Sequence, residues 1–171
     1  MESKDNPISK EIFVEKVVLH ATTSDVEKLD RYRKLLEYLT QRKPAVTKAK
    51  RRIEAFRIRK GLVIGYKVTL RKKEAVEKLK VLLAGIKHEL KSSQIGSGVV
   101  NFGIKEYITL PNFEYRRDIG ILGFDVSVVL AKKGKRVEYR KRCKAKVGKK
   151  QKVTKEETIE FLKNKFGVKI V

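Results

Sequence analysis

Apolar residues recur along this chain with two different periods, and the segments that carry each period alternate. The run EIFVEKVVLHA, from Glu11 to Ala21, is rich in β-branched and aromatic residues, which predicts a strand. Apolar residues then recur every three or four positions, so we expect a helix from about Asp25 to Thr40. Ser24 and Glu27 have the spacing of a capping box at its start, and Lys43-Pro44 is expected to stop it.

The pattern from Arg52 to Arg71 predicts a hairpin. Apolar and charged residues alternate between Arg52 and Arg59, with a phase slip at Ala55-Phe56 that indicates a bulge or bend. Strict alternation from Ile64 to Arg71 predicts a strand with one polar face. We therefore expect a basic hairpin over about residues 50–70.

A second helix and two further strands are predicted downstream. The helix follows from apolar residues that recur between Ala75 and Leu90, and it is expected to end before the loop Ser92 to Gly98. The strands are expected from Val100 to Leu110 and from Ile121 to Ala131.

The last forty residues predict a basic arm followed by a helix. Lys132 to Lys152 contains few apolar residues, so we expect a solvated loop or arm, over about residues 132–153, that orders on a partner. Thr154 and Glu157 form another capping box, which opens a short C-terminal helix.

These elements together predict an α+β fold. Strands with polar faces and helices between them favour a two-layer sandwich, in which a largely antiparallel sheet has its helices on one face. The basic arm and the short C-terminal helix are added to this sandwich. At 171 residues, 1–171 is expected to form a single domain.

Composition narrows the class of protein. No stretch approaches the roughly 20 apolar residues of a membrane span, and Met1 to Lys10 has no apolar core of a secretion signal. The single cysteine, Cys143, rules out an internal disulfide. We therefore expect a soluble intracellular protein with no membrane partner.

The positive charge of the chain is concentrated in two segments. Arg42 to Lys73 and Lys132 to Lys155 hold 26 of the 43 lysines and arginines and only two of the 20 acids, Glu54 and Glu138. The other 115 residues have a net charge of −1. Charge confined in this way attracts polyanions, and nucleic acid is the leading candidate partner.

Catalytic chemistry has little support in the sequence. His20, His88 and Cys143 show no metal-ligand spacing, so no enzyme activity, cofactor or metal site is expected. His88 is interpreted as a solvated residue of the second helix. Cys143 lies among basic residues that could make its thiol reactive, but no histidine is near it in sequence.

The basic hairpin has the residue types of an RNA contact. Phe56 and Ile53 are interleaved with arginines, whose guanidinium groups bind phosphates bidentately and stack on bases. Lys72 and Lys73, at a helix start, fit a solvated face equally well. If the two basic segments neutralise about 6 phosphates, affinity should fall about 10³-fold between 50 and 200 mM salt.

Four blocks of the sequence resemble a known family. They are KPAVTKAK at Lys43 to Lys50, FRIRKGLVIGYKVTLR at Phe56 to Arg71, FGIKEYITLP at Phe102 to Pro111 and GILGFDVSVVL at Gly120 to Leu130. In this order they resemble the large-subunit ribosomal protein L five family, called L eleven in eukaryotes. The resemblance extends from about Asn6 to Ile170. The basic arm and the block VTKEETIEFL resemble the archaeal and eukaryotic branch.

The resemblance implies a structural role in translation, in the central protuberance of the large ribosomal subunit. It implies binding of 5S rRNA through His20, Arg42 and Thr69, although many family members have Asn and Gln at the first two positions. The family's loop that reaches P-site tRNA aligns with Arg52 to Val63. Further implied partners are large-subunit rRNA, a ribosomal protein of the L eighteen family and a small-subunit protein at the intersubunit bridge. The implied location is the cytoplasmic ribosome, with a nucleolar or nuclear stage during assembly in a eukaryote.

Two sets of residues are therefore candidates for RNA contacts. The residues expected to bind rRNA are Lys16, His20, Arg42, Lys43, Thr47, Lys48, Lys50, Lys67, Thr69, Arg71, Arg136, Arg140, Arg142, Lys149 and Lys150. The residues expected to contact P-site tRNA are Arg52, Ile53, Phe56, Arg57, Arg59 and Lys60. The alternative is a free RNA-binding regulatory protein on the same fold, in which His20 and Arg42 mark lost 5S recognition. An RNA-modifying enzyme is the weakest hypothesis, since no acid lies suitably among the basic residues.

Overall fold

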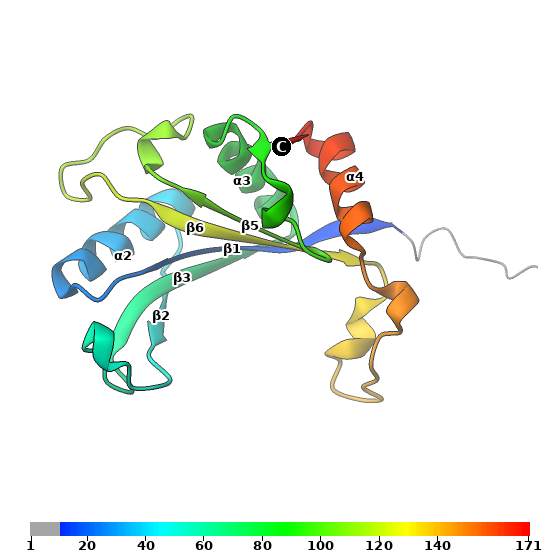
Figure 1. Cartoon of the computed structure of the whole chain (residues 1–171), viewed down its shortest axis with the longest axis horizontal. Helices are drawn as coiled ribbons and strands as arrows, with labels where there is room; N and C mark the ends of the chain where they lie inside the picture. The colour runs from blue at the N-terminus through cyan, green and yellow to red at the C-terminus, as the bar shows by residue number, and fades with distance from the viewer. Residues whose placement is uncertain (1–10) are drawn as a thin grey trace, which may run out of the picture.

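A computed structural model describes residues 11–171 and shows a five-stranded sheet in the order β2-β3-β1-β6-β5 (Figure 1). The strands are β1 (Ile12–Thr22), β2 (Ala45–Lys48), β3 (Val63–Arg71), β5 (Val99–Ile104) and β6 (Phe124–Lys132). All neighbouring strands in this sheet are antiparallel. The expectations for Met1 to Lys10, including the start of the family resemblance near Asn6, lie outside the described residues.

Within residues 11–171, three helices cover one face of the sheet: α2 (Val26–Thr40), α3 (Lys72–Gly85) and α4 (Lys155–Phe166) (Figure 1). The strands alternate buried and exposed side chains, so β1 turns Val17 and Leu19 into the core and β3 turns Val68 and Leu70 the same way. The helices contribute Leu35, Leu36 and Leu39 from α2, Leu79, Leu82 and Leu83 from α3, and Leu162 and Phe166 from α4. Burying each such leucine is worth about 2 kcal/mol. The predicted α+β sandwich is confirmed.

The chain between β5 and β6 packs closely over the edge of this core. Tyr107 is fully buried, and its hydroxyl oxygen accepts a hydrogen bond from the backbone N–H of Arg116 at 2.8 Å. At Gly123 a Cβ atom would lie 2.4 Å from the carbonyl oxygen of Lys105, which excludes any side chain without a backbone shift. This position therefore requires glycine because two backbone segments approach each other there.

The first helix begins one residue later than its predicted capping box requires. Its N-cap is Asp25, with no side-chain cap hydrogen bond, so Ser24 and Glu27 do not form the expected box. Instead the Thr23 hydroxyl accepts from the backbone N–H of Asp25 at 3.2 Å. The helix ends at Thr40, because Gln41 adopts a left-handed conformation before the Lys43-Pro44 pair is reached.

The hairpin contains β3 as predicted, but its first strand is different. β3 pairs with β2 and not with Arg52 to Arg59, where one isolated bridge joins Ile53 to Ile58. Within that bridge a 3-10 turn spans Glu54–Phe56 and Arg57 has a φ of 54°. The predicted bend at Ala55-Phe56 is thus present, but in a loop, because the alternating residues have no neighbouring strand to pair with.

Several predicted elements end earlier than the sequence indicated. α3 stops at Gly85, and Leu90 belongs to β4 (Glu89–Leu90), which pairs in parallel with β7 (Lys169–Ile170). The interpretation of His88 as a solvated helical residue is wrong. His88 lies in the turn after α3, half-buried and with a φ of 58°, and its Nδ1 has no hydrogen-bond partner among residues 11–171.

The two strands predicted after the second helix are also shorter. β5 stops at Ile104 and is followed by a 3-10 turn at Tyr107–Thr109, while β6 begins only at Phe124. Ile121, expected in the strand, is 64% exposed. Leu110 is nevertheless buried, because the loop folds back onto the core rather than continuing the strand.

The C-terminal helix has the capping box that the sequence predicts. The Thr154 hydroxyl accepts from the backbone N–H of Glu157 at 3.3 Å, and the Glu157 carboxylate accepts from the backbone N–H of Thr154 at 3.0 Å. Two backbone N–H groups at the start of α4, which have no hydrogen-bond partner within the helix, are paired in this way.

Candidate nucleic-acid interface

Polar and basic side chains line the face of the sheet opposite the helices, which we call the open face. Because Val17 and Leu19 point into the core, the residues between and beside them on β1 point the other way. On this face the register places Lys16 opposite Arg71, Val18 opposite Thr69 and His20 opposite Lys67. The fold thus brings together five of the residues expected to bind rRNA.

The half of the open face on β5 and β6 is different in character. Asp125 lies opposite His20, and Ser127 lies opposite both Val18 and Asn101. The Nε2 atom of His20 is 3.7 Å from a carboxylate oxygen of Asp125. Our sequence interpretation missed Asn101, Asp125 and Ser127 as site residues. A signal was available for Asp125 and Ser127, since the block DVSVV alternates with the same period as β3.

Residues 49–62, which we call the tip loop, connect β2 to β3. Backbone hydrogen bonds close its neck, from the N–H of Ala49 to the oxygen of Leu62 and from the N–H of Gly61 to the oxygen of Ala49. Phe56 is 65% exposed at the tip. In the same loop a shallow hollow is lined by Arg52, Glu54, Arg57, Ile58 and Arg59. An exposed ring beside several guanidinium groups can stack on a base and bind phosphate at once.

The residues at the edge of the sheet near β2 are mostly solvent-exposed. Lys43, Lys48 and Lys50 are exposed, and Thr47 is half-buried opposite Gly65 of β3. Arg42 is different, because its guanidinium forms an ion pair with Glu74 in the first turn of α3. An RNA phosphate at Arg42 would therefore have to share that side chain with a carboxylate or displace it.

Residues 132–153, which we call the basic arm, leave the end of β6 and return at α4. Three carboxylates engage the lysines at its root. Lys132 pairs with Glu157 at 2.7 Å, Lys135 pairs with Glu15 at 2.6 Å, and Lys133 pairs with Glu11. The hydrogen bond from Lys132 holds the pKa of Glu157 below its ordinary range, and Lys133 likewise lowers the pKa of Glu11.

Beyond its root, the basic arm presents its charge to solvent. Arg136, Arg140, Arg142, Lys149 and Lys150 are all exposed. As predicted, most of the arm is loop, with two short 3-10 turns at Lys135–Glu138 and Lys149–Gln151. Arg140 donates from Nε to the backbone oxygen of Cys143 at 2.9 Å.

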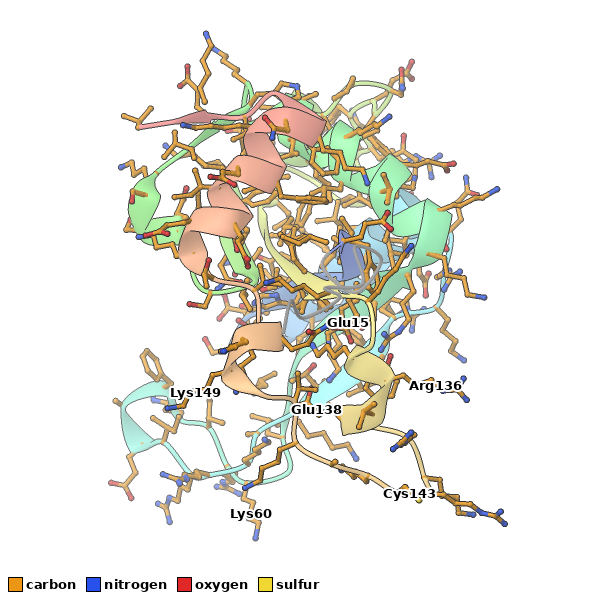
Figure 2. The ribbon with its side chains drawn as sticks, turned by 90° about the vertical axis from the view of Figure 1, so that its right-hand side faces the viewer. Glu15, Lys60, Arg136, Glu138, Cys143 and Lys149 are labelled. Atoms are coloured by element: carbon orange, nitrogen blue, oxygen red, sulfur yellow. The ribbon has the colours of Figure 1, made fainter. Side chains whose placement is uncertain are left out.

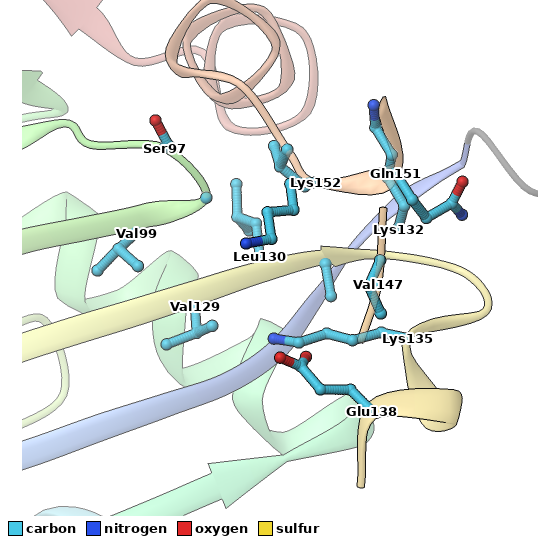
Figure 3. A pocket seen from close by; sticks show the side chains of 13 residues that line it. Ser97, Val99, Val129, Leu130, Lys132, Lys135, Glu138, Val147, Gln151 and Lys152 are labelled. Atoms are coloured by element: carbon cyan, nitrogen blue, oxygen red, sulfur yellow. The ribbon is translucent and has the colours of Figure 1, made fainter. Parts of the chain in front are cut away.

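A cavity of about 210 Å³ separates the basic arm from the strands (Figure 3). Val99, Val129 and Leu130 form its sheet side, and Val147 with Lys135 and Glu138 faces them from the arm. The arm therefore stands off from the sheet over part of its length, and ion pairs connect its root to Glu15 of β1 and Glu157 of α4.

The tip loop and the basic arm project on the same side of the sheet, away from the helices. Figure 1 shows them at opposite ends of the sheet, and Figure 2 shows Lys60 of the tip loop and Cys143 of the arm both below the strands. The open face lies between them. The arrangement is a polar surface flanked by two basic projections, which suits a large polyanion better than a small ligand.

Within residues 11–171 no cluster of three or more histidine, cysteine, aspartate or glutamate side chains could hold a metal ion. In the same part of the chain, no helix combines the length and apolar character needed to cross a bilayer.

Comparison with known proteins identifies a family. Residues 63–161 match the family model that describes the C-terminus of the ribosomal L five family. A protein of Pyrobaculum aerophilum is 44% identical over 169 residues, which cover 98% of this chain and 94% of the relative. Relatives from Sulfurisphaera tokodaii and Archaeoglobus fulgidus are each 44% identical, over 97% and 96% of this chain and 95% and 94% of their own lengths. All three relatives are named large ribosomal subunit protein uL5.

Proposed function

The chain belongs to the uL5 family of large ribosomal subunit proteins, which are structural and not enzymatic, and on this basis we propose that it binds 5S rRNA and large-subunit rRNA. As a family member the chain is a constituent of the ribosome. The proposal adds that it lies in the central protuberance and contacts P-site tRNA through the tip loop.

The observation that carries this proposal is the placement of the basic residues. The tip loop and the basic arm, which are distant in sequence and rich in lysine and arginine, project on one side of the sheet (Figure 1), around an open face that also carries Lys16, Lys67 and Arg71. Phosphate contacts of this kind position a protein on RNA without reading its sequence. The hydrophobic core lies on the helix side of the sheet, so core packing and the proposed RNA contact use opposite faces.

We assign three parts of this surface to three different RNAs. His20 and Thr69, together with Arg42 at the nearby edge, are the proposed 5S contacts, and the basic arm is the proposed contact to large-subunit rRNA. The tip loop, with Phe56 and its arginines, is the proposed tRNA contact, because it projects furthest from the helices at its end of the sheet (Figure 1).

The remaining partners and the domain organisation are part of the same proposal. The proposed partners are a ribosomal protein of the L eighteen family and a small-subunit protein at the intersubunit bridge. The proposed location is the cytoplasmic ribosome. We also propose that residues 1–171 form one domain, because α2, α3 and α4 share one hydrophobic core with the sheet.

A gel-shift titration of the purified chain against its cognate 5S rRNA tests the central claim. We expect binding that weakens about 10³-fold between 50 and 200 mM salt if about 6 phosphates are contacted. Replacing Lys67 by alanine should weaken binding and reduce the salt slope by about 1. No salt-sensitive binding by the unaltered chain would refute the proposal.

A second candidate function is a free RNA-binding regulator on this fold, and the ion pair between Arg42 and Glu74 is compatible with it. In that protein Arg42 would serve the fold and not 5S rRNA. Sedimentation of a cell lysate separates the two, because a ribosomal protein travels with the large subunit and a free regulator stays near the top of the gradient.

A further inference from the structure

The open face carries a hollow whose chemistry does not suit phosphate. It has a volume of about 420 Å³ and lies over β1, β5 and β6. Its polar lining residues are His20, Gln94, Asn101, Asp125 and Ser127, and neither lysine nor arginine is among its lining residues. We call it the base hollow, for the reason developed below.

Asp125 is the central group of the base hollow. Its carboxylate is 63% exposed, and His20 approaches it from one side at 3.7 Å. Gly103, directly opposite on β5, leaves the space beside it open, since a Cβ atom there would lie 3.2 Å from a carboxylate oxygen of Asp125. The glycine therefore keeps the carboxylate accessible from the β5 side.

Hydrogen-bond donors lie next to this acceptor. Asn101 is opposite Ser127 in the register, so an amide and a hydroxyl face the same space one row along the strands. The carboxylate repels phosphate but accepts well from two N–H groups set side by side. The hollow thus combines a carboxylate that can accept two hydrogen bonds with neutral donors. Lys67 on β3, opposite His20, supplies positive charge beside it that can hold a nucleic-acid backbone.

We propose that the base hollow receives one unpaired guanine of ribosomal RNA. The N1–H and the N2 amine of guanine, which are adjacent, donate to the Asp125 carboxylate, and the side chains of Asn101 and Ser127 donate to O6. Guanine is the only standard base that offers two adjacent donors with a neighbouring acceptor on its pairing edge. Unpaired bases of RNA are read along this edge. The inference rests on the proposed function, because it requires rRNA on the open face.

The Asp125→Asn substitution should change RNA affinity in opposite directions depending on whether the open face binds RNA by charge alone or reads a guanine. If only electrostatics matters, removal of a negative charge from an RNA-binding face strengthens binding or leaves it unchanged. If Asp125 reads guanine, the substitution weakens binding about tenfold or more, as expected for loss of a bidentate base contact, without changing the salt slope. Asp30→Asn, an equal change of charge at an exposed residue of α2, is the matched control.

The experiment uses the full chain with two RNAs, cognate 5S rRNA and a large-subunit rRNA transcript, each also made with guanosine partly replaced by inosine. Inosine lacks the N2 amine of guanosine. Inosine at one unpaired position of the RNA should therefore weaken binding of the unaltered chain. That weakening should vanish with Asp125→Asn, and the RNA in which it occurs identifies the source of the base.

Failure of this inference can be told apart from failure of the proposed function. If the unaltered chain binds neither RNA, the proposed function itself is wrong. If it binds with the expected salt dependence while Asp125→Asn binds as tightly as Asp30→Asn and inosine has no effect, only the base hollow is refuted. Circular dichroism and thermal unfolding should show that both variants fold as the unaltered chain does.

Discussion

Replacing Glu157 by glutamine is expected to destabilise the protein by about 2 kcal/mol. One carboxylate oxygen of Glu157 accepts from the Lys132 ammonium at 2.7 Å, and the other accepts from the backbone N–H of Thr154 at 3.0 Å. Glutamine offers one oxygen and one NH₂ group in these two places, and an NH₂ group cannot accept a hydrogen bond. The variant therefore loses one of the two contacts and weakens the other.

The magnitude follows from the burial of the two partners. The lysine is 8% exposed and the glutamate 36% exposed. Loss of the cap contact costs about 1 kcal/mol. Loss of the carboxylate's charge beside a nearly buried ammonium adds about another 1 kcal/mol, between the values for exposed and fully buried pairs. For a chain of this size, a total of about 2 kcal/mol corresponds to a melting temperature lower by about 4–8 °C.

Thermal unfolding measured by calorimetry tests this expectation, with Lys132→Met as the paired variant. Methionine fills the same buried space without a charge, and Glu157 is exposed enough to be hydrated, so we expect a loss below about 1 kcal/mol. In the double variant the two losses should not add, because both remove the same contact. A greater loss of stability in Lys132→Met than in Glu157→Gln would contradict this account of the contact.

Three further predictions follow from other contacts. The pKa of Glu157 is depressed below its ordinary value of 4.5. The stability contributed by its ionised form is therefore fully present above pH 4.5 and is lost as pH falls through the lower pKa of the folded state. The difference in stability between the unaltered chain and Glu157→Gln, measured by urea unfolding, should shrink below pH 4.5. Gly123→Ala should lower the free energy of unfolding by about 2 kcal/mol or more, because its Cβ meets the Lys105 oxygen, whereas Gly148→Ala, where nothing lies within 4 Å, should have little effect. Phe56→Ala should leave the melting temperature unchanged but weaken tRNA binding to ribosomes about tenfold, and an equal effect of Tyr115→Ala, an exposed aromatic outside the tip loop, would contradict a stacking role.

The sequence predicted elements whose patterning is local. The alternation from Ile64 to Arg71 and the capping box of Thr154 and Glu157 each depend on residues within one segment, and both are present in the structure. Leu90 shows the opposite case. It continues the helical spacing of α3, but its burial comes from the parallel pairing of β4 with β7, about eighty residues further along the chain. Spacing within a segment cannot reveal a partner at that distance.

The sequence predicted the basic projections of the candidate site but not the acidic and neutral half of its open face. Lysines and arginines are frequent in the tip loop and the basic arm, and the fold places both segments on one side of the sheet. The base hollow was not foreseen, because Asn101, Asp125 and Ser127 become one surface only when β5 and β6 pair. Arg42 was expected to be available for RNA, but the fold brings Glu74 of α3 against it.

The ion pair between Lys132 and Glu157 also has an entropic consequence for RNA binding. It joins the residue where the basic arm begins to the helix where the arm returns, so both ends of the arm are fixed when the protein folds. The entropic cost of closing this loop therefore arises during folding. An RNA that later immobilises the arm has to remove only the conformational freedom that remains in the middle of the arm. An arm attached at one end would have to lose that freedom in the complex, with a corresponding loss of affinity.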